Sequence, residues 1–143
     1  MKPSVFYRIA AVLLLLWTIG HTLGFRQSDP KWGVDALIAS MQSIRFDTQG
    51  FSRSYWDFFV GFGLFVSVFL FFTAVLTWQL GGLNRDTLRL MPVLTWTLAT
   101  CFIGLTVLSW MYFFTLAVVF SAVISLCLIT AAWLAGKHDR GQA

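Results

Sequence analysis

Long apolar stretches, broken by polar residues at only a few places, cover most of the chain. A helix needs about 20 mostly apolar residues to cross the hydrocarbon core of a bilayer. Two stretches have about that length, and a third, over residues 88–135, is long enough for two crossings. We expect the turn within it near Trp110 and Tyr112, because such aromatic residues gather at membrane interfaces. The pattern therefore predicts four transmembrane helices, at residues 5–24, 56–80, 88–109 and 113–135.

The long hydrophilic segment between the first two spans carries a helical pattern of its own. Residues 28–30, Ser-Asp-Pro, are typical of a helix start, with a capping side chain ahead of a proline. Apolar residues then recur at helical spacing, with polar residues on the opposite face. We expect a short amphipathic helix over about residues 30–45, lying on the outer surface of the bundle or in the plane of the membrane interface.

Basic residues are unequally divided between the two sides of the predicted membrane. The termini and the second loop carry six basic and two acidic residues, whereas the first loop and its flanks carry four of each. Because cytoplasmic segments are enriched in Lys and Arg, we expect both termini on the cytoplasmic side of the cell membrane. The first apolar run lacks a small-residue cleavage site, so we expect a retained span and not a signal peptide. Residues 1–143 are interpreted as one membrane domain, an all-α bundle of four transmembrane helices.

Composition agrees with a membrane protein and excludes several other classes. Of the 143 residues, 58% are hydrophobic and 11% are charged, whereas a soluble domain has about 25% charged residues. The charges, net +4, flank the apolar runs and form no basic stripe, so nucleic acid is not an expected partner. Cys101 and Cys127 lie in apolar runs without a neighbouring His, and His21 is the only His within a span. We therefore expect no metal and no other cofactor.

Small residues recur at helical spacing within the spans, where close contact between helices in lipid requires them. We expect them to line contacts within the bundle, and a seam between two copies of the chain is the alternative. The positions are Gly20 and Gly24 in the first span, Gly63 and Ser67 in the second, Gly104 in the third, and Ser121 and Ser125 in the fourth.

Ionisable residues are rare within membrane spans and are enriched at functional sites. His21 lies in the last turn of the first span and Asp57 in the first turn of the second, so both lie near the outer side. A His–Asp pair can transfer protons, and a neighbouring Arg can hold an anionic headgroup. The sequence thus predicts a ligand site at this end, with His21 and Asp57 as candidate catalytic residues. The predicted ligand-binding residues are Thr18, His21, Arg53, Trp56, Asp57 and Trp110.

A purely structural interpretation of the two ionisable residues stays open. Ser54 and Asp57 have the spacing of a capping box, and a carboxylate also suits the positive end of a helix dipole. His21 suits the negative end of the first helix in the same way. On this interpretation neither residue needs a ligand.

Residues 21–24, HTLG, and residues 55–63, YWDFFVGFG, carry a resemblance to known sequences. In these segments, and over most of its length, the chain resembles a group of uncharacterised bacterial four-helix integral membrane proteins. That resemblance implies a topology and no particular activity. The long first loop is also similar to that of emopamil-binding and sigma-2-receptor-type proteins, which bind sterol-like amines or isomerise sterols with buried acidic residues. This chain has no Glu, so only Asp57 matches that pattern.

Three functions are open from the sequence. We expect a site for a hydrophobic or amphipathic, lipid-like small molecule on the outer-leaflet side, near His21 and Asp57, whether or not the protein is an enzyme. The alternative is a non-catalytic accessory subunit that packs against a larger complex in the lipid bilayer. The third is a small transporter, which needs a homo-oligomer because the spans carry no acidic residue in mid-membrane.

Overall fold

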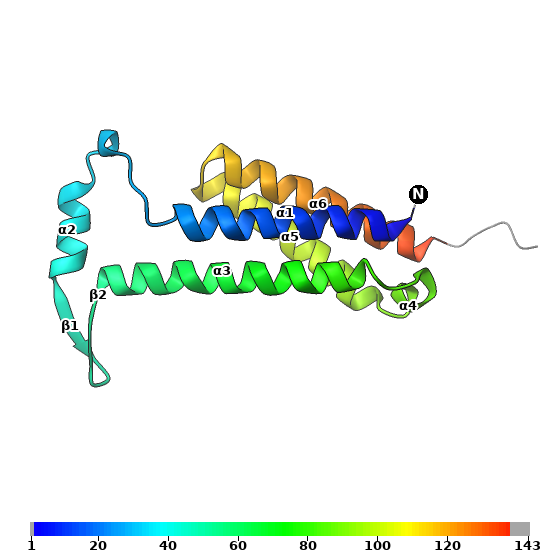
Figure 1. The fold of residues 1–143 in the computed structure, drawn as a ribbon, viewed down its shortest axis with the longest axis horizontal. Coiled ribbons are helices and arrows are strands. Elements are labelled where there is room, and N and C mark those ends of the chain that lie inside the picture. The colour runs from blue at the N-terminus through cyan, green and yellow to red at the C-terminus, as the bar shows by residue number, and fades with distance from the viewer. Residues whose placement is uncertain (1, 138–143) are drawn as a thin grey trace, which may run out of the picture. The chain divides into compact units, whose positions relative to one another are not determined.

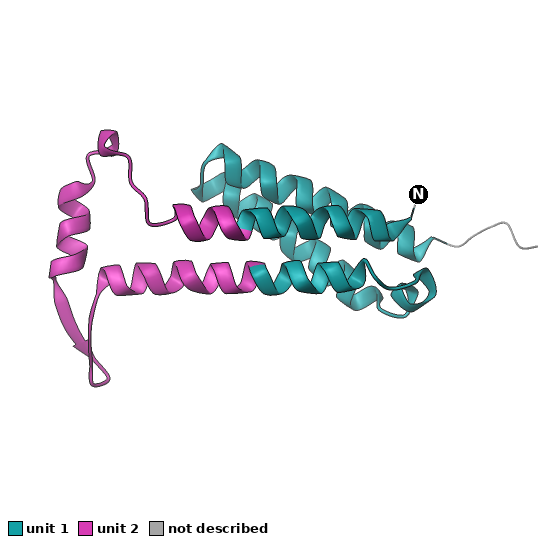
Figure 2. Cartoon of the chain, in the orientation of Figure 1, with its two compact units in different colours: residues 1–17, 71–143 teal, residues 18–70 magenta. Residues whose placement is uncertain are grey.

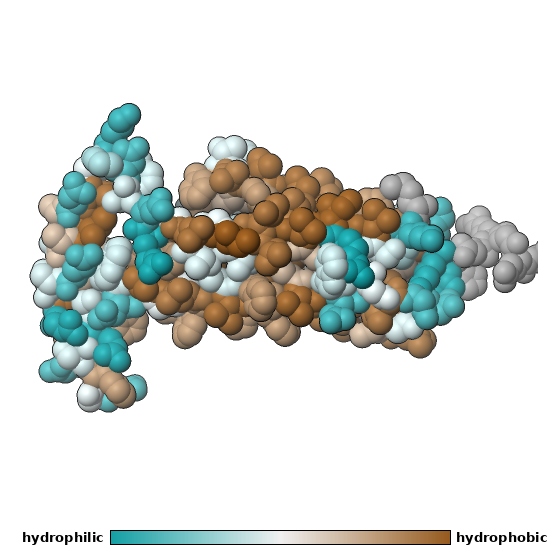
Figure 3. Space-filling view, viewed as in Figure 1, coloured by the Kyte–Doolittle hydropathy of each residue, from teal (hydrophilic) through white to brown (hydrophobic). Residues whose placement is uncertain are grey.

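Four long helices account for most of the structure, a computed structural model that describes residues 2–137 (Figure 1). Each is long and apolar enough to cross a membrane, which confirms the prediction of four helical spans. They are α1 (Pro3–Gly24), α3 (Tyr55–Leu80), α5 (Pro92–Tyr112) and α6 (Thr115–Gly136). Large apolar side chains are exposed along these helices, as surfaces that meet lipid require (Figure 3).

The third and fourth spans differ from their predicted bounds. The third begins at Pro92 and not at Leu88, because α4 (Arg85–Arg89) is a separate short helix and a proline suits the first turn of the next one. The turn between α5 and α6 lies at residues 113–114, later than predicted, and Trp110 is still helical. Trp110 and Tyr112 therefore lie in the last turn of α5 and not in the connection between the two helices.

The chain forms two compact units (Figure 2). Unit 1 contains the chain up to Trp17 and again from Phe71 onward, whereas unit 2 contains Thr18–Leu70. Both α1 and α3 contribute residues to each unit, because the bounds fall within these helices. Most of the buried residues that the structure describes belong to unit 1.

Small residues make up a large part of the core of unit 1, beside buried Leu, Ile and aromatic side chains, and they allow helix backbones to approach closely. Ser121 and Ser125 of α6, both predicted as packing positions, are buried, and Thr106 Oγ1 of α5 lies 3.3 Å from Ser125 Oγ. Gly104, also predicted, lies instead at an open surface, since a β-carbon there would meet no neighbouring atom within 4 Å. The buried alanines of unit 1 are Ala10, Ala11, Ala74, Ala99, Ala117, Ala131, Ala132 and Ala135.

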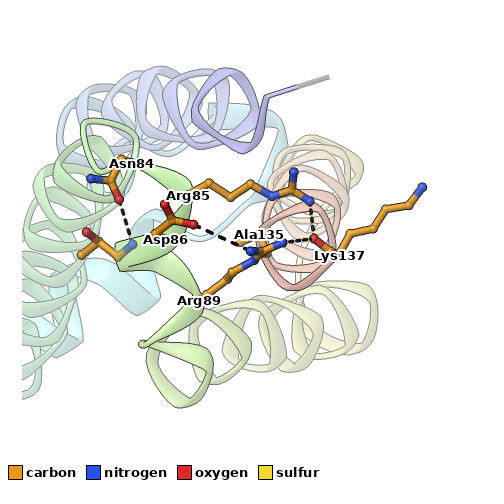
Figure 4. A network of polar contacts seen from close by, with 7 residues as sticks. Asn84, Arg85, Asp86, Arg89, Ala135 and Lys137 are labelled. Atoms are coloured by element: carbon orange, nitrogen blue, oxygen red, sulfur yellow. Dashed lines mark hydrogen bonds and ion pairs between the residues drawn. The ribbon is translucent and has the colours of Figure 1, made fainter. Parts of the chain in front are cut away.

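Two arginines of the second loop hold the C-terminal end of α6 (Figure 4). Arg89 donates from Nη2 to the Lys137 carbonyl at 2.6 Å and from Nε to the Ala135 carbonyl at 3.3 Å. Arg85 donates to the Lys137 carbonyl as well. The last carbonyls of a helix have no partners within it, so these guanidinium groups satisfy them and complement the negative end of the helix dipole. Arg85 and Arg89, which contribute to the excess of basic residues on one side of the predicted membrane, thus also stabilise the end of α6.

Unit 2 contains the long first loop, which folds into short elements. The turn η1 (Pro30–Trp32) follows Asp29, whose carboxylate accepts a backbone N–H two residues further on at 2.9 Å. Gly33 then adopts a left-handed conformation, with a φ of 64°, before α2 (Asp35–Ser43) begins. The predicted single helix over residues 30–45 is therefore wrong in its bounds, because Gly33 interrupts it. No residue of α2 is buried, and its position at a membrane surface stays a prediction.

A β-hairpin, which the sequence pattern did not predict, leads from α2 into α3. Its strands β1 (Arg45–Thr48) and β2 (Phe51–Ser54) pair antiparallel. Gln49 and Gly50 form the turn, and both have positive φ, as two-residue hairpin turns require. The fold is therefore mostly helical, consistent with the predicted all-α membrane protein, and carries one small two-stranded sheet in the first loop. Because Ser54 directly precedes Tyr55, the hairpin places the start of α3.

Candidate functional site

A polar cluster of unit 2 lies where the end of α1 packs against α3. His21 Nδ1 lies 3.1 Å from Ser67 Oγ, and Thr22 Oγ1 lies 2.9 Å from the same oxygen. The Ser67 hydroxyl also lies 3.2 Å from the Gly63 carbonyl of its own helix. Thr18 enters the cluster through its backbone, because its carbonyl lies 2.7 Å from Thr22 Oγ1. Ser67 is only 7% exposed, so protein groups and not water surround its hydroxyl.

The position of the Ser67 proton decides the tautomer of His21. A serine hydroxyl has one proton and two lone pairs. When Ser67 donates to the Gly63 carbonyl, its oxygen can accept from the Nδ1–H of His21. The Thr22 hydroxyl has one proton to donate, either to Ser67 Oγ or to the Thr18 carbonyl. The neutral imidazole then has its lone pair on Nε2, which has no hydrogen-bond partner among residues 2–137. This nitrogen can accept a proton or a ligand's hydrogen bond.

Phe25 covers this cluster and depends on a glycine of α3. The Phe25 ring stacks on the His21 ring, with centroids 5.2 Å apart and planes within 13°. The same ring lies against Gly63, where an added β-carbon would be 2.2 Å from Phe25 Cε2. Phe59 meets its other side at 6.0 Å. Gly63 therefore serves the packing role that its spacing predicts, although its partner is a phenyl ring.

Asp57 forms a reciprocal cap with Ser54 at the start of α3. The Ser54 backbone N–H donates to Asp57 Oδ2 at 2.8 Å, and the Asp57 backbone N–H donates to Ser54 Oγ at 3.2 Å. This is the capping box that the sequence spacing indicates. The Asp57 side chain is exposed, and its Oδ1 has no hydrogen-bond partner in the described part of the chain. Asp57 Oδ2 therefore caps the start of α3, and Oδ1 is accessible to an outside donor.

Arg53 and Asp57 line one end of a shallow groove along α3. The groove has a volume of about 280 Å³, and its remaining walls are Phe58, Gly61, Phe62 and Phe65. Gly61 leaves it open, since a β-carbon there would meet no neighbouring atom within 4 Å. Arg53 is held by its own strand, because Nη1 donates to the Ser52 carbonyl at 2.9 Å. The groove thus joins two opposite charges to an aromatic floor.

The two ionisable residues of the predicted site lie in different surroundings. Asp57 faces the groove with Gly61, whereas His21 meets α3 at Gly63 and Ser67. At 3.6 residues per turn, these two pairs of α3 residues lie on different faces of the helix. The structure therefore gives His21 and Asp57 separate partners, and within residues 2–137 no hydrogen bond or ring contact joins the two side chains.

The two predicted tryptophans also have separate places. The Trp56 ring packs on Phe59, with centroids 5.3 Å apart, and does not line the groove. Trp110 belongs to unit 1 and is 78% exposed. Of the predicted ligand-binding residues, the structure thus brings Arg53 and Asp57 together in one site and Thr18 and His21 together in another.

Sequence reasoning missed the roles of three residues at these sites. Ser67 was predicted only for helix packing, although it is the one polar residue in the central, Phe-rich part of α3 and therefore a signal for a buried hydrogen bond. Phe25 and Gly61 carried no signal, because neither an aromatic residue nor a single glycine is unusual in a span.

Metal-ligating side chains do not gather in the described part of the chain. Among residues 2–137, no group of three His, Cys, Asp or Glu side chains is placed to hold a metal ion. Cys101 and Cys127 are free thiols.

No protein-family model matches the chain. No curated protein and no solved structure matches it either. The resemblance of residues 21–24 and 55–63 to bacterial four-helix proteins stays a prediction. Functional conclusions therefore rest on the geometry of the two sites.

Proposed function

We propose that the protein is a multi-pass protein of the bacterial inner membrane, with cytoplasmic termini, that binds an amphipathic small molecule at the groove along α3. The main support for this proposal is the composition of that groove, with Arg53 and Asp57 at one end and Phe62 and Phe65 along its floor. Small-ligand sites are mostly apolar with a few placed polar groups, and this groove has that character.

The charges favour a ligand with a zwitterionic head and an apolar tail. The free Oδ1 of Asp57 can accept from an ammonium group, while the guanidinium of Arg53 can donate to a phosphate or carboxylate. A tail can lie on the Phe62 and Phe65 rings above Gly61, where no side chain blocks the floor. The ligand would reach the site from lipid, since these phenyl rings are 64% and 63% exposed.

A proton-transfer role of His21 is a separate part of the proposal. Its support is the Nε2 lone pair that remains when Ser67 accepts from Nδ1–H. Catalysis by a His21–Asp57 pair has less support, because Asp57 is bonded to Ser54 and lines another face of α3. Binding at the groove does not depend on this role.

Native mass spectrometry of protein extracted gently from its own membrane tests the ligand site first. We expect an extra mass below about 1,000 daltons, bound once per chain, as pockets of this size accept. Lysophosphatidylethanolamine, which has one acyl chain and a head group with a phosphate and an ammonium group, then serves as a defined probe in detergent. Arg53→Gln and Asp57→Asn should each weaken its binding about tenfold, because each removes one charged hydrogen bond.

Two matched glycine substitutions separate groove filling from loss of folding. Gly61→Leu places a side chain in the groove and should abolish probe binding. Gly104→Leu, at an open position of α5, should leave binding unchanged. Asp57→Asn retains an oxygen that can accept from the Ser54 N–H, so the helix start is kept. Unchanged probe binding in Gly61→Leu and Asp57→Asn would reject the groove as the site.

An accessory subunit of a larger membrane complex is the second candidate, and the first loop favours it. Between α1 and α3, four large apolar side chains are at least 59% exposed: Trp32, Leu37, Ile44 and Phe51. Such surfaces mark sites of protein or membrane contact. Co-purification of one protein at fixed stoichiometry, lost when Leu37 and Phe51 are changed to Ser, would favour this function over the ligand site.

A further inference from the structure

Arg8 is a charged residue within the apolar part of α1. It lies five residues after Pro3, so its backbone is about 7.5 Å along the helix from the N-terminal end. A charge at this depth needs a partner or a path to the interface. Among residues 2–137 no carboxylate forms an ion pair with Arg8, and the guanidinium group contacts the ring of Trp78. The edge of the guanidinium is therefore open to an acceptor from outside the chain.

Two residues of unit 1, Trp78 in α3 and Gly81 just after it, define the position of the Arg8 side chain. Its guanidinium carbon lies 3.8 Å from the centroid of the Trp78 ring, a close cation–π contact. Its stem passes Gly81, where an added β-carbon would lie 3.2 Å from Arg8 Cδ and Nε. Gly81 therefore does more than end α3, because it provides room for the arginine.

An apolar groove begins at this arginine. It has a volume of about 600 Å³ and is lined by Arg8, Ile9, Val12, Leu13 and Trp78. Ile9, Val12 and Trp78 are each between 45% and 48% exposed, so the groove opens to the surroundings of the helices. A cation at the end of an apolar groove matches an anion that carries a hydrocarbon chain.

We propose that this groove binds one anionic phospholipid, with its phosphate on Arg8 and an acyl chain along Ile9, Val12 and Leu13. Stacking on Trp78 orients the guanidinium and leaves its edge N–H groups to donate to two phosphate oxygens. The charge and the groove act together, so a free phosphate ion or a neutral lipid satisfies only half of the site. The proposed lipid lies near the start of α1 and the end of α3. This site is separate from the one proposed for an amphiphile at Arg53 and Asp57.

The test is native mass spectrometry and thermal unfolding of the full chain in detergent with added phosphatidylglycerol. We expect one lipid per chain and a rise in Tm, with phosphatidylcholine binding about tenfold more weakly. Arg8→Gln should weaken the binding of phosphatidylglycerol by the same factor, because it removes the charged donor. Val12→Trp should lose binding by filling the groove while Arg8 stays in place.

Matched controls remove a charge or add a tryptophan elsewhere. Lys2→Gln removes a positive charge at the same end, and Val119→Trp adds bulk at an exposed position of α6. Both should bind phosphatidylglycerol as the unchanged chain does, and so should Gly61→Leu. Equal loss in Lys2→Gln would overturn the proposal in favour of unspecific charge attraction. Full retention in Val12→Trp, or displacement by millimolar inorganic phosphate, would also overturn it.

Discussion

Phe25 lies so close to Gly63 that a β-carbon at position 63 would be 2.2 Å from Phe25 Cε2. The phenyl ring is held there because it also stacks on His21 and meets Phe59. The end of α1 can therefore contact α3 at this level only while position 63 is a glycine or the ring moves. This pair links helix packing to the environment of the imidazole.

Gly63→Ala is expected to destabilise the protein by about 1–3 kcal/mol, because the methyl group forces the Phe25 ring out of its place. Gly61→Ala is the matched control, since a β-carbon there meets open space, and it should change stability little. Unfolding in detergent measures both variants. Phe25→Ala should largely remove the difference between them; a Gly63→Ala variant as stable as Gly61→Ala would contradict the contact.

Ser67→Ala should change the tautomer balance of His21, because it removes the oxygen that accepts from Nδ1–H. The cost in stability should be small, about 0.6 kcal/mol, as is usual for hydrogen bonds between membrane helices. Nitrogen-15 chemical shifts of the imidazole report the tautomer, and His138→Gln assigns the signal. Ser43→Ala, at an exposed residue of α2, is the control. An unchanged nitrogen spectrum in Ser67→Ala would exclude the hydrogen bond.

Ser54→Ala should destabilise the start of α3 by about 1 kcal/mol, because Ser54 is buried and caps the Asp57 N–H. Asp57→Ala should act in the same direction by removing the acceptor of the Ser54 N–H. Since the two residues serve one cap, the double variant should lose less than the two single losses together. Hydrogen exchange of the first turn of α3 measures this coupling, and strictly additive losses would argue against a reciprocal cap.

Thr77→Val is expected to keep or raise stability, up to about 1 kcal/mol. Thr77 is fully buried, and its hydroxyl has no hydrogen-bond partner in the described part of the chain. An unsatisfied buried hydroxyl costs free energy that the isosteric methyl group does not. Thr95→Val is the matched control, since Thr95 donates to the Met91 or Pro92 carbonyl and should lose stability. A clear loss in Thr77→Val would indicate a bound water or another partner.

Local patterns predicted those features that depend on a few neighbouring residues. Helix α3 ends at Leu80, the predicted end of the second span, and the Ser54–Asp57 spacing forms the expected cap. The hairpin escaped prediction because its strands have four residues each, too few for a clear alternation. The break in the helix at Gly33 was not predicted, because a single glycine in a sequence does not indicate that it adopts a left-handed conformation.

The sequence by itself determined that four helices are long and apolar enough to cross a membrane, because that depends only on length and hydropathy. It also singled out His21 and Asp57, since ionisable side chains are rare in such helices, and Arg53 just before the second of them. Tertiary structure decided the partners that lie far apart in the sequence, above all Ser67 for His21, and the groove that Arg53 and Asp57 share with Gly61. The physical reason is that a rotation about a helix axis separates residues that are close in sequence, and packing between helices sets that rotation.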